Sequence, residues 1–422
     1  EVVNYRSCVR GRPASNNDIA RILREETDSA LRREAWEASK EIGGRIADRI
    51  RRLAHLRNEG ARRLGFPDYY HLSLTGQELD PEELFGLLDQ LAERTEEGFR
   101  ETKARLDERL ARRFGVAPDD LRPWHYGDPY FQQAPHDPDV DLSPHLDGKD
   151  LVALARRTYE GFGMEVEDIL ARSDLFEREG KDQHAFCMDV DRKGDVRILT
   201  NLRPDERWMT TLLHELGHAV YDKYIDRDLP WLLRRPAHPF TTEGVAILMG
   251  RQIRHPRWLR DVLGLPETDV DRLAGGLERR ERLHSLVFIR WALVMVHFER
   301  ALYADPDQDL DAVWWDLKAR FQLLTPPEGR RAPDWAAKYH VALAPTYYHN
   351  YILGELFASQ LEATLEERFG GLVGVPEAGA YLIETVFAPG ARWDWRTLVE
   401  RATGHPLSPE PFAAWTASGP LL

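Results

Sequence analysis

The strongest constraint on the fold is a long N-terminal stretch in which apolar residues recur every three or four positions between charges. It covers residues 17–114 and includes "DIARILREETDSALRREAWEASKEIGGRIADRIRRL". Such spacing is typical of amphipathic helices, and the stretch carries almost no alternating β pattern. Helical patterning resumes at Lys149 and dominates to the end of the chain. The sequence therefore predicts a mainly α fold.

Two segments interrupt this helical pattern. Residues 117–144 are rich in Pro and Asp, which is typical of a long connection between two halves. Residues 184–202 contain "HAFCMDV" and "DVRILTNL" on either side of the turn "DRKG", which predicts two short strands. The length allows about two or three domains or one large unit. We expect one unit over 1–422, with a helical half at 1–116 joined to a second half at 145–422.

Composition indicates which binding partners and which cellular compartment to expect. The chain has 57 Lys and Arg against 71 Asp and Glu, a formal net charge of −14. This acidic balance argues against nucleic acid or an anionic membrane as a partner. The richest apolar run, 286–298, is broken by Arg290 and predicts a buried helix, not a membrane span. The chain has only two cysteines and no signal-peptide pattern at its N-terminus, so we expect a cytoplasmic location. The oligomeric state is not predicted.

The segment "LLHELGHAVYDK", residues 212–223, contains the pattern His-Glu-x-x-His. Asp205 can cap a helix through 205–224, in which His214 and His218 share one face. They can present two imidazoles to one metal ion, and zinc prefers such nitrogen ligands. Glu215 is rotated by about 100°, so it can reach a water molecule at the metal without ligating it. Alternatively, the histidines are ordinary helix residues, but two buried imidazoles without partners would be costly.

A zinc site of this kind needs a third protein ligand. Asp222 shares the helix face, but it lies about 12 Å along the axis from His214, too far for one ion. The remaining candidates are His238, in "RRPAHPF", and Glu243, in the helical stretch "TTEGVAILMGRQI". We favour Glu243, because a ligand on a rigid second helix is better positioned than one in a loop. The sequence therefore predicts one zinc ion per chain.

These motifs resemble the core of the angiotensin-converting-enzyme family of gluzincin zinc peptidases. The resemblance is carried by "GDVRILTNLRPDERWMTTLLHELGHAVYDKYIDRDLPWLLRRPAHPFTTEGVA", by "HAFCMD" before it, and by "VWWDLKARFQLLTPP" and "KYHVALAPTYYHNY" after it. It spans residues 17 to 415. "PTYYHNYILG" is also similar to the related oligoendopeptidase and thimet-oligopeptidase family. The resemblance implies a single catalytic unit with a large helical fold and a deep central channel between two halves.

The resemblance also implies roles for individual residues. The family's three zinc ligands and its general base fall on residues already named: His214, His218, Glu243 and Glu215. The pair at 184–185, His184 and Ala185, matches an edge strand that pairs with extended substrate.

Four further residues match parts of the family's substrate-binding and catalytic apparatus. Lys338 matches a binder of the substrate's C-terminal carboxylate, and His340 matches a donor to the substrate carbonyl. Tyr348 and Tyr351 match a pair in which one phenol binds substrate and the other stabilises the oxyanion. A gap-free match would instead select Tyr347 and Asn350. We keep Tyr348 and Tyr351, because the oligopeptidase-like "PTYYHNY" supports them.

The chain departs from the converting-enzyme pattern at three places. Ile247 stands where that enzyme has an Asp that supports a zinc ligand, so the partner of His214 is unassigned. The glutamine that helps to hold the substrate carboxylate is not found; Pro144 and His145 stand near its expected place. His349 replaces an arginine associated with chloride activation, which argues against a chloride cofactor.

We therefore expect a zinc metallopeptidase that hydrolyses short oligopeptides with metal-activated water and releases C-terminal dipeptides. Three alternatives remain open. The chain could act as an oligoendopeptidase, as a catalytically idle peptide-binding protein of the same fold, or as an amidase of a non-peptide metabolite.

Overall fold

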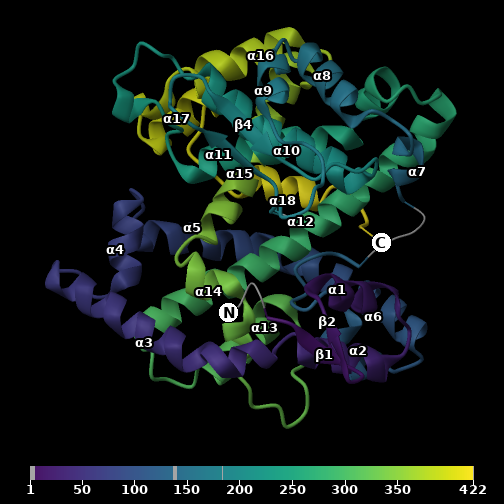
Figure 1. The fold of residues 1–422 in the computed structure, drawn as a ribbon, viewed down its shortest axis with the longest axis vertical. Helices are drawn as coiled ribbons and strands as arrows, with labels where there is room; N and C mark the ends of the chain where they lie inside the picture. Colours follow the sequence, from purple (N-terminus) through teal and green to yellow (C-terminus); the bar gives the residue numbers. More distant parts are fainter. Residues whose placement is uncertain (1–4, 136–139, 183, 422) are drawn as a thin grey trace. The chain divides into compact units, whose positions relative to one another are not determined.

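The computed structural model describes residues 5–135, 140–182 and 184–421. Within these residues the chain is mainly α-helical and has two small antiparallel sheets of two strands each (Figure 1). The expected fold class is thus confirmed. The chain forms two compact units. The first comprises Glu1–His136, Arg282–His349 and Thr416–Leu422, and the second comprises Asp137–Glu281 and Asn350–Trp415.

Each unit has its own set of elements, and three helices have residues in both. The first unit contains β1 (Ser7–Val9), β2 (Arg12–Ala14), α1 (Asn16–Glu25), α2 (Ser29–Ala38), α3 (Glu41–Arg63), α4 (Tyr69–Gly76), α5 (Pro81–Arg94), α6 (Glu96–Phe114), α13 (Leu310–Gln322) and α14 (Tyr339–Leu343). The second unit contains α7 (Ser143–Leu146), α8 (Leu151–Gly161), α9 (Glu167–Arg172), β3 (Phe186–Asp189), β4 (Val196–Leu199), α10 (Glu206–Tyr224), α11 (Pro239–Arg251), α16 (Pro376–Leu382) and α17 (Trp395–Thr403). The shared helices are α12 (Glu267–Ala304), α15 (His349–Phe369) and α18 (Glu410–Thr416).

The units do not follow the sequence halves 1–116 and 145–422. The chain passes from the second unit to the first within α12 and returns within α15, so neither unit is one continuous piece. The segment 117–135 is also not a free linker, because it buries Trp124, Tyr126 and Phe131 in the first unit. Large aromatic side chains indicate that a segment packs against a core, even where its Pro-rich composition is typical of a loop.

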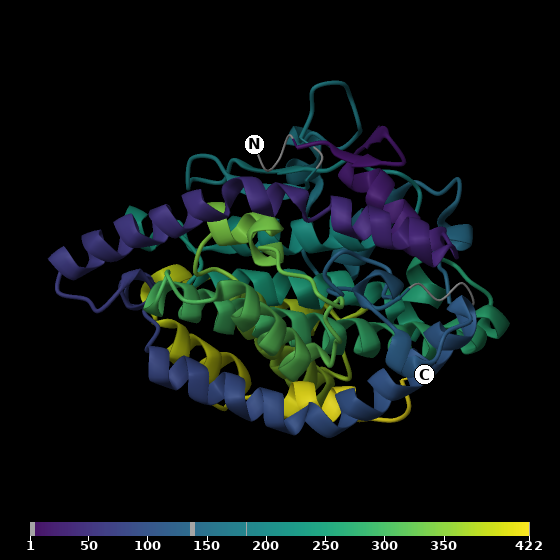
Figure 2. The ribbon, with the colours of Figure 1, turned by 90° about the horizontal axis from the view of Figure 1, so that it is seen from below.

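In the first unit, α12 packs against helices from the N-terminal part of the chain. Its Tyr303 carbonyl accepts a hydrogen bond from Asn58 of α3 at 2.7 Å, and its Arg290 donates to the Ala92 carbonyl of α5 at 2.9 Å. In Figure 2 the green helices of this unit accordingly lie between the purple α3 and the blue α5–α6 pair. The apolar run 286–298 is therefore a buried helix, as predicted.

The hairpin β1–β2 was not predicted from the sequence. Its strands have only three residues each, which is too short for an alternating pattern to be visible. The turn is made by Arg10 and Gly11, whose φ angles are 51° and 72°. Two-residue hairpin turns favour positive φ at both positions, and Asn-Gly or Asp-Gly is their usual signature. Arg-Gly lacks that signature.

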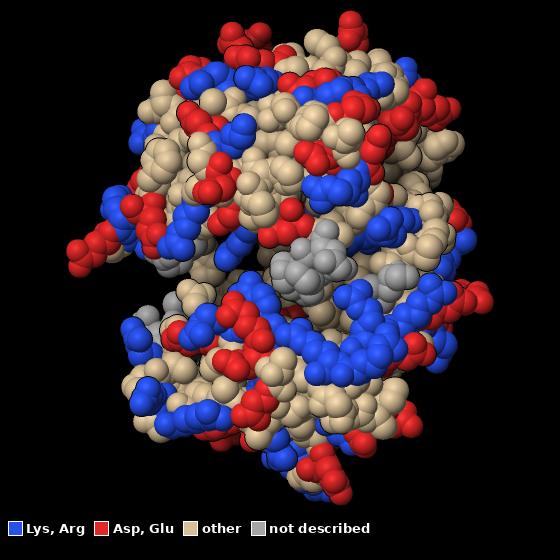
Figure 3. Space-filling model, turned by 90° about the vertical axis from the view of Figure 1, so that its right-hand side faces the viewer, with Lys and Arg blue, Asp and Glu red and all other residues tan. Residues whose placement is uncertain are grey.

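Charge is unevenly distributed over the surface. Figure 3 shows a face of the first unit, around α1, α2 and α6, on which Lys and Arg side chains form a band despite the acidic total. Among the described residues, no helix combines the length and the apolar character that a membrane span requires.

Candidate metal centre

The helix α10 carries the His-Glu-x-x-His residues and begins where the sequence predicts. Asp205 is its N-cap, and the Asp205 carboxylate accepts a hydrogen bond from the Trp208 amide at 2.8 Å. His214 and His218 lie on one face, with ring centroids 4.9 Å apart. Glu215, one residue further round, is buried with 7% of its surface exposed. The local helix thus presents two imidazoles together and a carboxyl group beside them.

Glycines allow the neighbouring helices to come close enough to add a third group. A Cβ at Gly217 of α10 would lie 2.8 Å from the Ala246 Cα of α11. A Cβ at Gly354 of α15 would lie 3.1 Å from the Cγ of Glu243. Real Cβ atoms essentially never approach as closely as 2.8 Å, so a larger residue at Gly217 would push α10 and α11 apart, and one at Gly354 would displace the Glu243 side chain. The close packing of α10, α11 and α15 therefore fixes the position of the Glu243 carboxylate.

The side chains of His214, His218 and Glu243 converge on one point. Their ligand atoms all lie within 4.8 Å of one another. His214 Nε2 is 3.7 Å from Glu243 Oε1, and His218 Nε2 is 3.6 Å from Glu243 Oε2. Ligands at about 2.0–2.1 Å from a tetrahedral zinc ion lie roughly 3.4 Å from each other. The spacing and the two-nitrogen, one-carboxylate donor set therefore fit zinc, and they leave a coordination position open.

Hydrogen bonds orient both imidazoles. The ring nitrogen Nδ1 of His218 lies 2.8 Å from Thr242 Oγ1, which leaves Nε2 for a metal. His214 forms a hydrogen bond with the backbone of Ala246. The backbone of Ala246 is therefore the partner of His214. The sequence left this partner unassigned, because Ile247 stands where the converting enzyme has an Asp. A backbone group leaves no signature in the sequence, so residue types alone could not have located it.

Burial favours the neutral form of all four groups. It lowers the pKa of His214 to about 4, and burial together with the neighbouring His214 lowers the pKa of His218. Neutral imidazole is the form that binds a metal. Burial and the charge of Glu243 raise the pKa of Glu215 to about 8, so these two carboxyl groups lie close enough to interact. Burial and the charge of Glu355 raise the pKa of Glu243 to about 7.

The two rejected ligand candidates lie in other surroundings. The ring of His238 is the N-cap of α11, where its Nδ1 accepts a hydrogen bond from the Phe240 amide at 3.2 Å. Asp222 is half-buried, and burial together with the nearby charge of Asp189 raises the pKa of its carboxyl group to about 7. Neither joins the group formed by His214, His218 and Glu243 in the described residues.

In the first unit, the Lys338 ammonium is surrounded by aromatic rings and by one side-chain amide. It donates to Gln132 Oε1 at 2.8 Å and lies 5.0 Å from the ring centroid of Tyr130 and 5.8 Å from that of Tyr348. Gln132 is thus a glutamine beside the proposed carboxylate binder. The sequence search missed it because it lies in the irregular segment before residue 135, more than ten residues from the expected place.

His340 and Tyr348 lie together in the same unit. Both are buried, and their ring centroids are 4.9 Å apart. The Tyr348 hydroxyl accepts a hydrogen bond from Trp291 Nε1 at 3.0 Å. Tyr347 and Asn350, which a gap-free match would select instead, differ from each other in burial: Tyr347 is half-buried, whereas Asn350 is fully buried.

Tyr348 and Tyr351 do not share a helix face. The helix α15 begins at His349, so Tyr348 precedes it, and the chain before it turns through Pro345 and Thr346, whose φ is 52°. Tyr351 is instead three residues before Gly354 on α15, and residues at this spacing share a face. Tyr351 therefore lies on the side of α15 that packs against Glu243.

The residues His184 and Ala185 lie directly before β3. His184 is exposed and Ala185 is half-buried. The strand β3 contacts α10 and pairs with β4, so both predicted strands are confirmed and lie beside the helix with the histidine pair.

Comparison with known proteins identifies the family of the chain. A family model described as Peptidase family M3 matches residues 22–417. The chain belongs to this family. Its membership agrees with the resemblance drawn from the motifs.

Individual relatives match shorter stretches. Angiotensin-converting enzyme of Rattus norvegicus is 24% identical over 240 residues, which cover 52% of this chain and 18% of that protein. Thermostable carboxypeptidase 1 of Thermus thermophilus is 28% identical over 267 residues, which cover 53% of this chain and 48% of that protein. The match thus spans about half or less of these curated relatives.

We predict that the close approach at Gly217 is needed for metal binding. Gly217→Ala should force α10 and α11 apart, weaken zinc binding about 10- to 100-fold and lower the melting temperature. Gly60→Ala in α3 is the matched control, because its added Cβ meets no atom within 4 Å. That variant should keep zinc affinity and gain about 0.5–1 kcal/mol of stability. Titration with zinc and thermal unfolding measure both effects; equal zinc affinity in the two variants would contradict the prediction.

Proposed function

We propose that the chain is a zinc-dependent peptidase that hydrolyses short peptides. The observation that supports this best is the convergence of His214, His218 and Glu243 with Glu215 beside them. The three ligand candidates leave an open coordination position, which is the arrangement of a catalytic rather than a structural zinc site. Membership of Peptidase family M3 is consistent with this chemistry.

The proposed mechanism assigns proton transfer to Glu215. A bound zinc ion would lower the pKa of a water molecule and polarise the scissile carbonyl. The Glu215 carboxylate removes a proton from the attacking water and delivers it to the leaving amine. Tyr351, on the face of α15 beside Glu243, donates a hydrogen bond to the carbonyl oxygen as negative charge develops there. His340 donates to a substrate carbonyl and so holds the peptide in position.

Metal removal tests the proposal. A chelator should abolish cleavage of a quenched fluorogenic peptide, and zinc should restore it. Glu243→Gln should weaken zinc binding while the fold persists, measured by zinc content and circular dichroism, because a neutral amide is a poorer ligand than a carboxylate. If that variant keeps full zinc occupancy and His238→Ala loses it, His238 is the ligand. Peptide turnover that persists after complete removal of zinc would contradict the metallopeptidase proposal.

We further propose that the enzyme releases dipeptides from free C-termini. The support is Lys338 with Gln132: a buried ammonium and an adjacent amide can together hold a carboxylate. In this role Tyr348 lines the same carboxylate site, since its ring is close to the Lys338 ammonium. His184 and Ala185 would guide the peptide further from its C-terminus.

The pH dependence of peptide affinity should report the charge of Lys338. Burial lowers the pKa of Lys338 to about 8. Its ammonium is therefore charged below pH 8 and becomes neutral as the pH rises through 8. We expect the KM of a free-acid peptide to increase above pH 8, while the KM of its C-terminally amidated twin stays flat over the same range.

The comparison of these twins also separates the two kinds of peptidase. The free-acid peptide should be cleaved at least tenfold more efficiently near pH 7, because its carboxylate gains a charge-assisted pair. Equal kcat/KM values for both twins, with products from internal bonds, would support oligoendopeptidase action instead. Zinc binding without turnover of any peptide in a library would support the idle-protein or amidase alternatives.

A further inference from the structure

The strand β3 and the residue that follows it present a row of large, exposed apolar side chains on one face. Phe186, Met188 and Val190 are 39%, 53% and 52% exposed, and the residues between them are half-buried. This alternation follows from the two-residue period of a strand, whose other face lies against α10. In the hairpin turn that follows, the Arg192 guanidinium lies 4.4 Å from the ring centroid of Trp231, which is itself 51% exposed. We call Phe186, Met188 and Val190 the apolar row.

The backbone of β3 has an edge that does not face β4. The Val190 amide donates to the Asp195 carbonyl at 2.9 Å, and in an antiparallel ladder only alternate residues bond to the partner strand. Met188 therefore bonds to β4, whereas Cys187 and Asp189 direct their N–H and C=O groups to the opposite edge. In the part of the chain that the structure describes, β3 pairs with β4 alone. A peptide could add a strand at this edge.

The direction of β3 relative to α10 decides which part of a substrate would meet it. Burial, together with the charges of Asp222 and Glu215, raises the pKa of the Cys187 thiol, so Cys187 lies near both of these carboxyl groups of α10. Further along β3, the Asp189 carboxylate is 3.6 Å from Arg227, which follows the end of α10. The strand therefore runs from the candidate general base away from the metal group. A peptide paired antiparallel to it runs toward the metal, so its residues over β3 precede the scissile bond.

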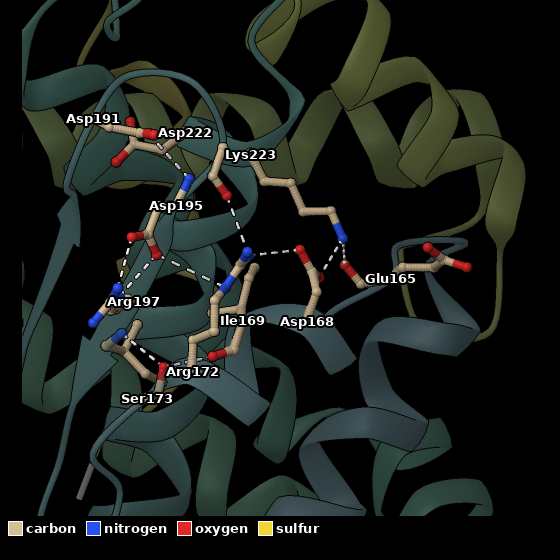
Figure 4. A network of polar contacts seen from close by, with 12 residues as sticks. Glu165, Asp168, Ile169, Arg172, Ser173, Asp191, Asp195, Arg197, Asp222 and Lys223 are labelled. Carbon is tan, nitrogen blue, oxygen red and sulfur yellow. Dashed lines mark hydrogen bonds and ion pairs between the residues drawn. The ribbon is translucent and has the colours of Figure 1, made fainter.

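Polar contacts hold this hairpin against its supporting helices. Figure 4 shows them from Lys223 of α10 through Asp168 and Arg172 of α9 to Asp195 at the hairpin turn. The Lys223–Asp168 and Arg172–Asp168 pairs are 2.6 and 2.9 Å apart, and Arg172 also donates to the Gly194 carbonyl at 3.2 Å. An edge that is fixed at its turn offers a peptide a prearranged register, which reduces the ordering cost of binding.

We propose that the apolar row selects substrates with apolar side chains at two positions, separated by one residue, on the N-terminal side of the scissile bond. The inference rests on the proposed peptidase function and specifies its substrates. A peptide residue opposite Met188 has its side chain on the same face as Met188, and so does the residue two positions nearer the scissile bond, opposite Phe186. The side chain of the residue between them faces α10, so the apolar row does not select it.

Cleavage of a peptide library with product mapping tests this pattern. Wild-type enzyme should favour Leu, Ile, Phe or Met at both positions, by about 2- to 5-fold each, as expected for one cross-strand contact. Met188→Glu should change the preference at one position from apolar to Lys or Arg. Phe186→Glu should make the same change at the position two residues nearer the scissile bond. The shift by two residues is a readout that a general loss of stability cannot produce.

The matched control is Leu56→Glu, because Leu56 is an equally exposed apolar residue, at 55%, on α3. It should leave every preference unchanged. Affinity of the same peptides for Glu215→Gln enzyme, measured by fluorescence anisotropy, reports selection without turnover and should show the same two positions. Chelator-sensitive cleavage with no preference at alternating positions would overturn the inference alone. Absence of both cleavage and peptide binding in the wild type would overturn it together with the proposed function.

Discussion

Glu215→Gln should lower kcat about 100- to 10,000-fold, the range typical for loss of a general acid–base group. The amide keeps the size of the side chain but cannot accept and return a proton. Zinc content should remain at the wild-type value, because Glu215 is adjacent to the ligand candidates but is not among them. Single-turnover kinetics on a quenched peptide, with zinc measured in the same sample, give both quantities.

Two results would contradict this assignment. Turnover within tenfold of the wild type would mean that another group moves the proton. A parallel loss of zinc would mean that Glu215 supports the metal. Glu206→Gln is a useful control, since Glu206 is a carboxylate at the start of the same helix that pairs with Arg280. That variant should keep kcat and lose only stability.

Tyr351→Phe should lower kcat and kcat/KM together by about 100- to 1,000-fold, with KM little changed. The reason is that its phenol would donate mainly to the oxygen on which charge develops, so the loss affects the transition state more than the bound substrate. Its place on α15, one turn before the glycine that packs on Glu243, puts it on the side of the third ligand candidate. The ring remains in Phe, so the melting temperature should stay close to the wild type.

The control for Tyr351 is Tyr348→Phe. The Tyr348 hydroxyl is already bonded to Trp291, and the residue lies before α15. Its loss should raise the KM of free-acid peptides more than it lowers kcat. If Tyr348→Phe shows the kcat defect and Tyr351→Phe turns over normally, the roles of the two tyrosines are exchanged. If neither matters, the developing charge is stabilised elsewhere, with His340 as the next candidate.

Features governed by local rules could be predicted from the sequence. The cap at Asp205, the histidine pair on one face of α10 and the two strands near 184–202 each depend on residues within a few positions of one another. The choice of Glu243 over His238 also followed from a local argument, namely that a helix positions a ligand better than a loop. In the structure His238 caps that helix, and Glu243 is the residue beside the two histidines.

What the sequence could not reveal depends on residues far apart in the chain. Gln132 and Lys338 are separated by about 200 positions, and the partner of His214 is a backbone group of another helix. The exclusion of Tyr348 from α15 had a visible signal, because Pro345 and the turn at Thr346 interrupt the helix before it. The choice of Tyr348 and Tyr351 rested instead on the resemblance of "PTYYHNY" to the oligopeptidase family.

The interleaved order of the two units has a consequence for synthesis. On the ribosome α10 and α11 emerge first, and the α15 segment that packs on Glu243 follows roughly 100 residues later, about 5–20 s at ordinary rates. During that interval the two helices that carry the ligand candidates lack the surface against which they pack. Nascent chains arrested before α15 should therefore retain zinc poorly, and no fragment that ends at the boundary near residue 281 can carry the complete second unit.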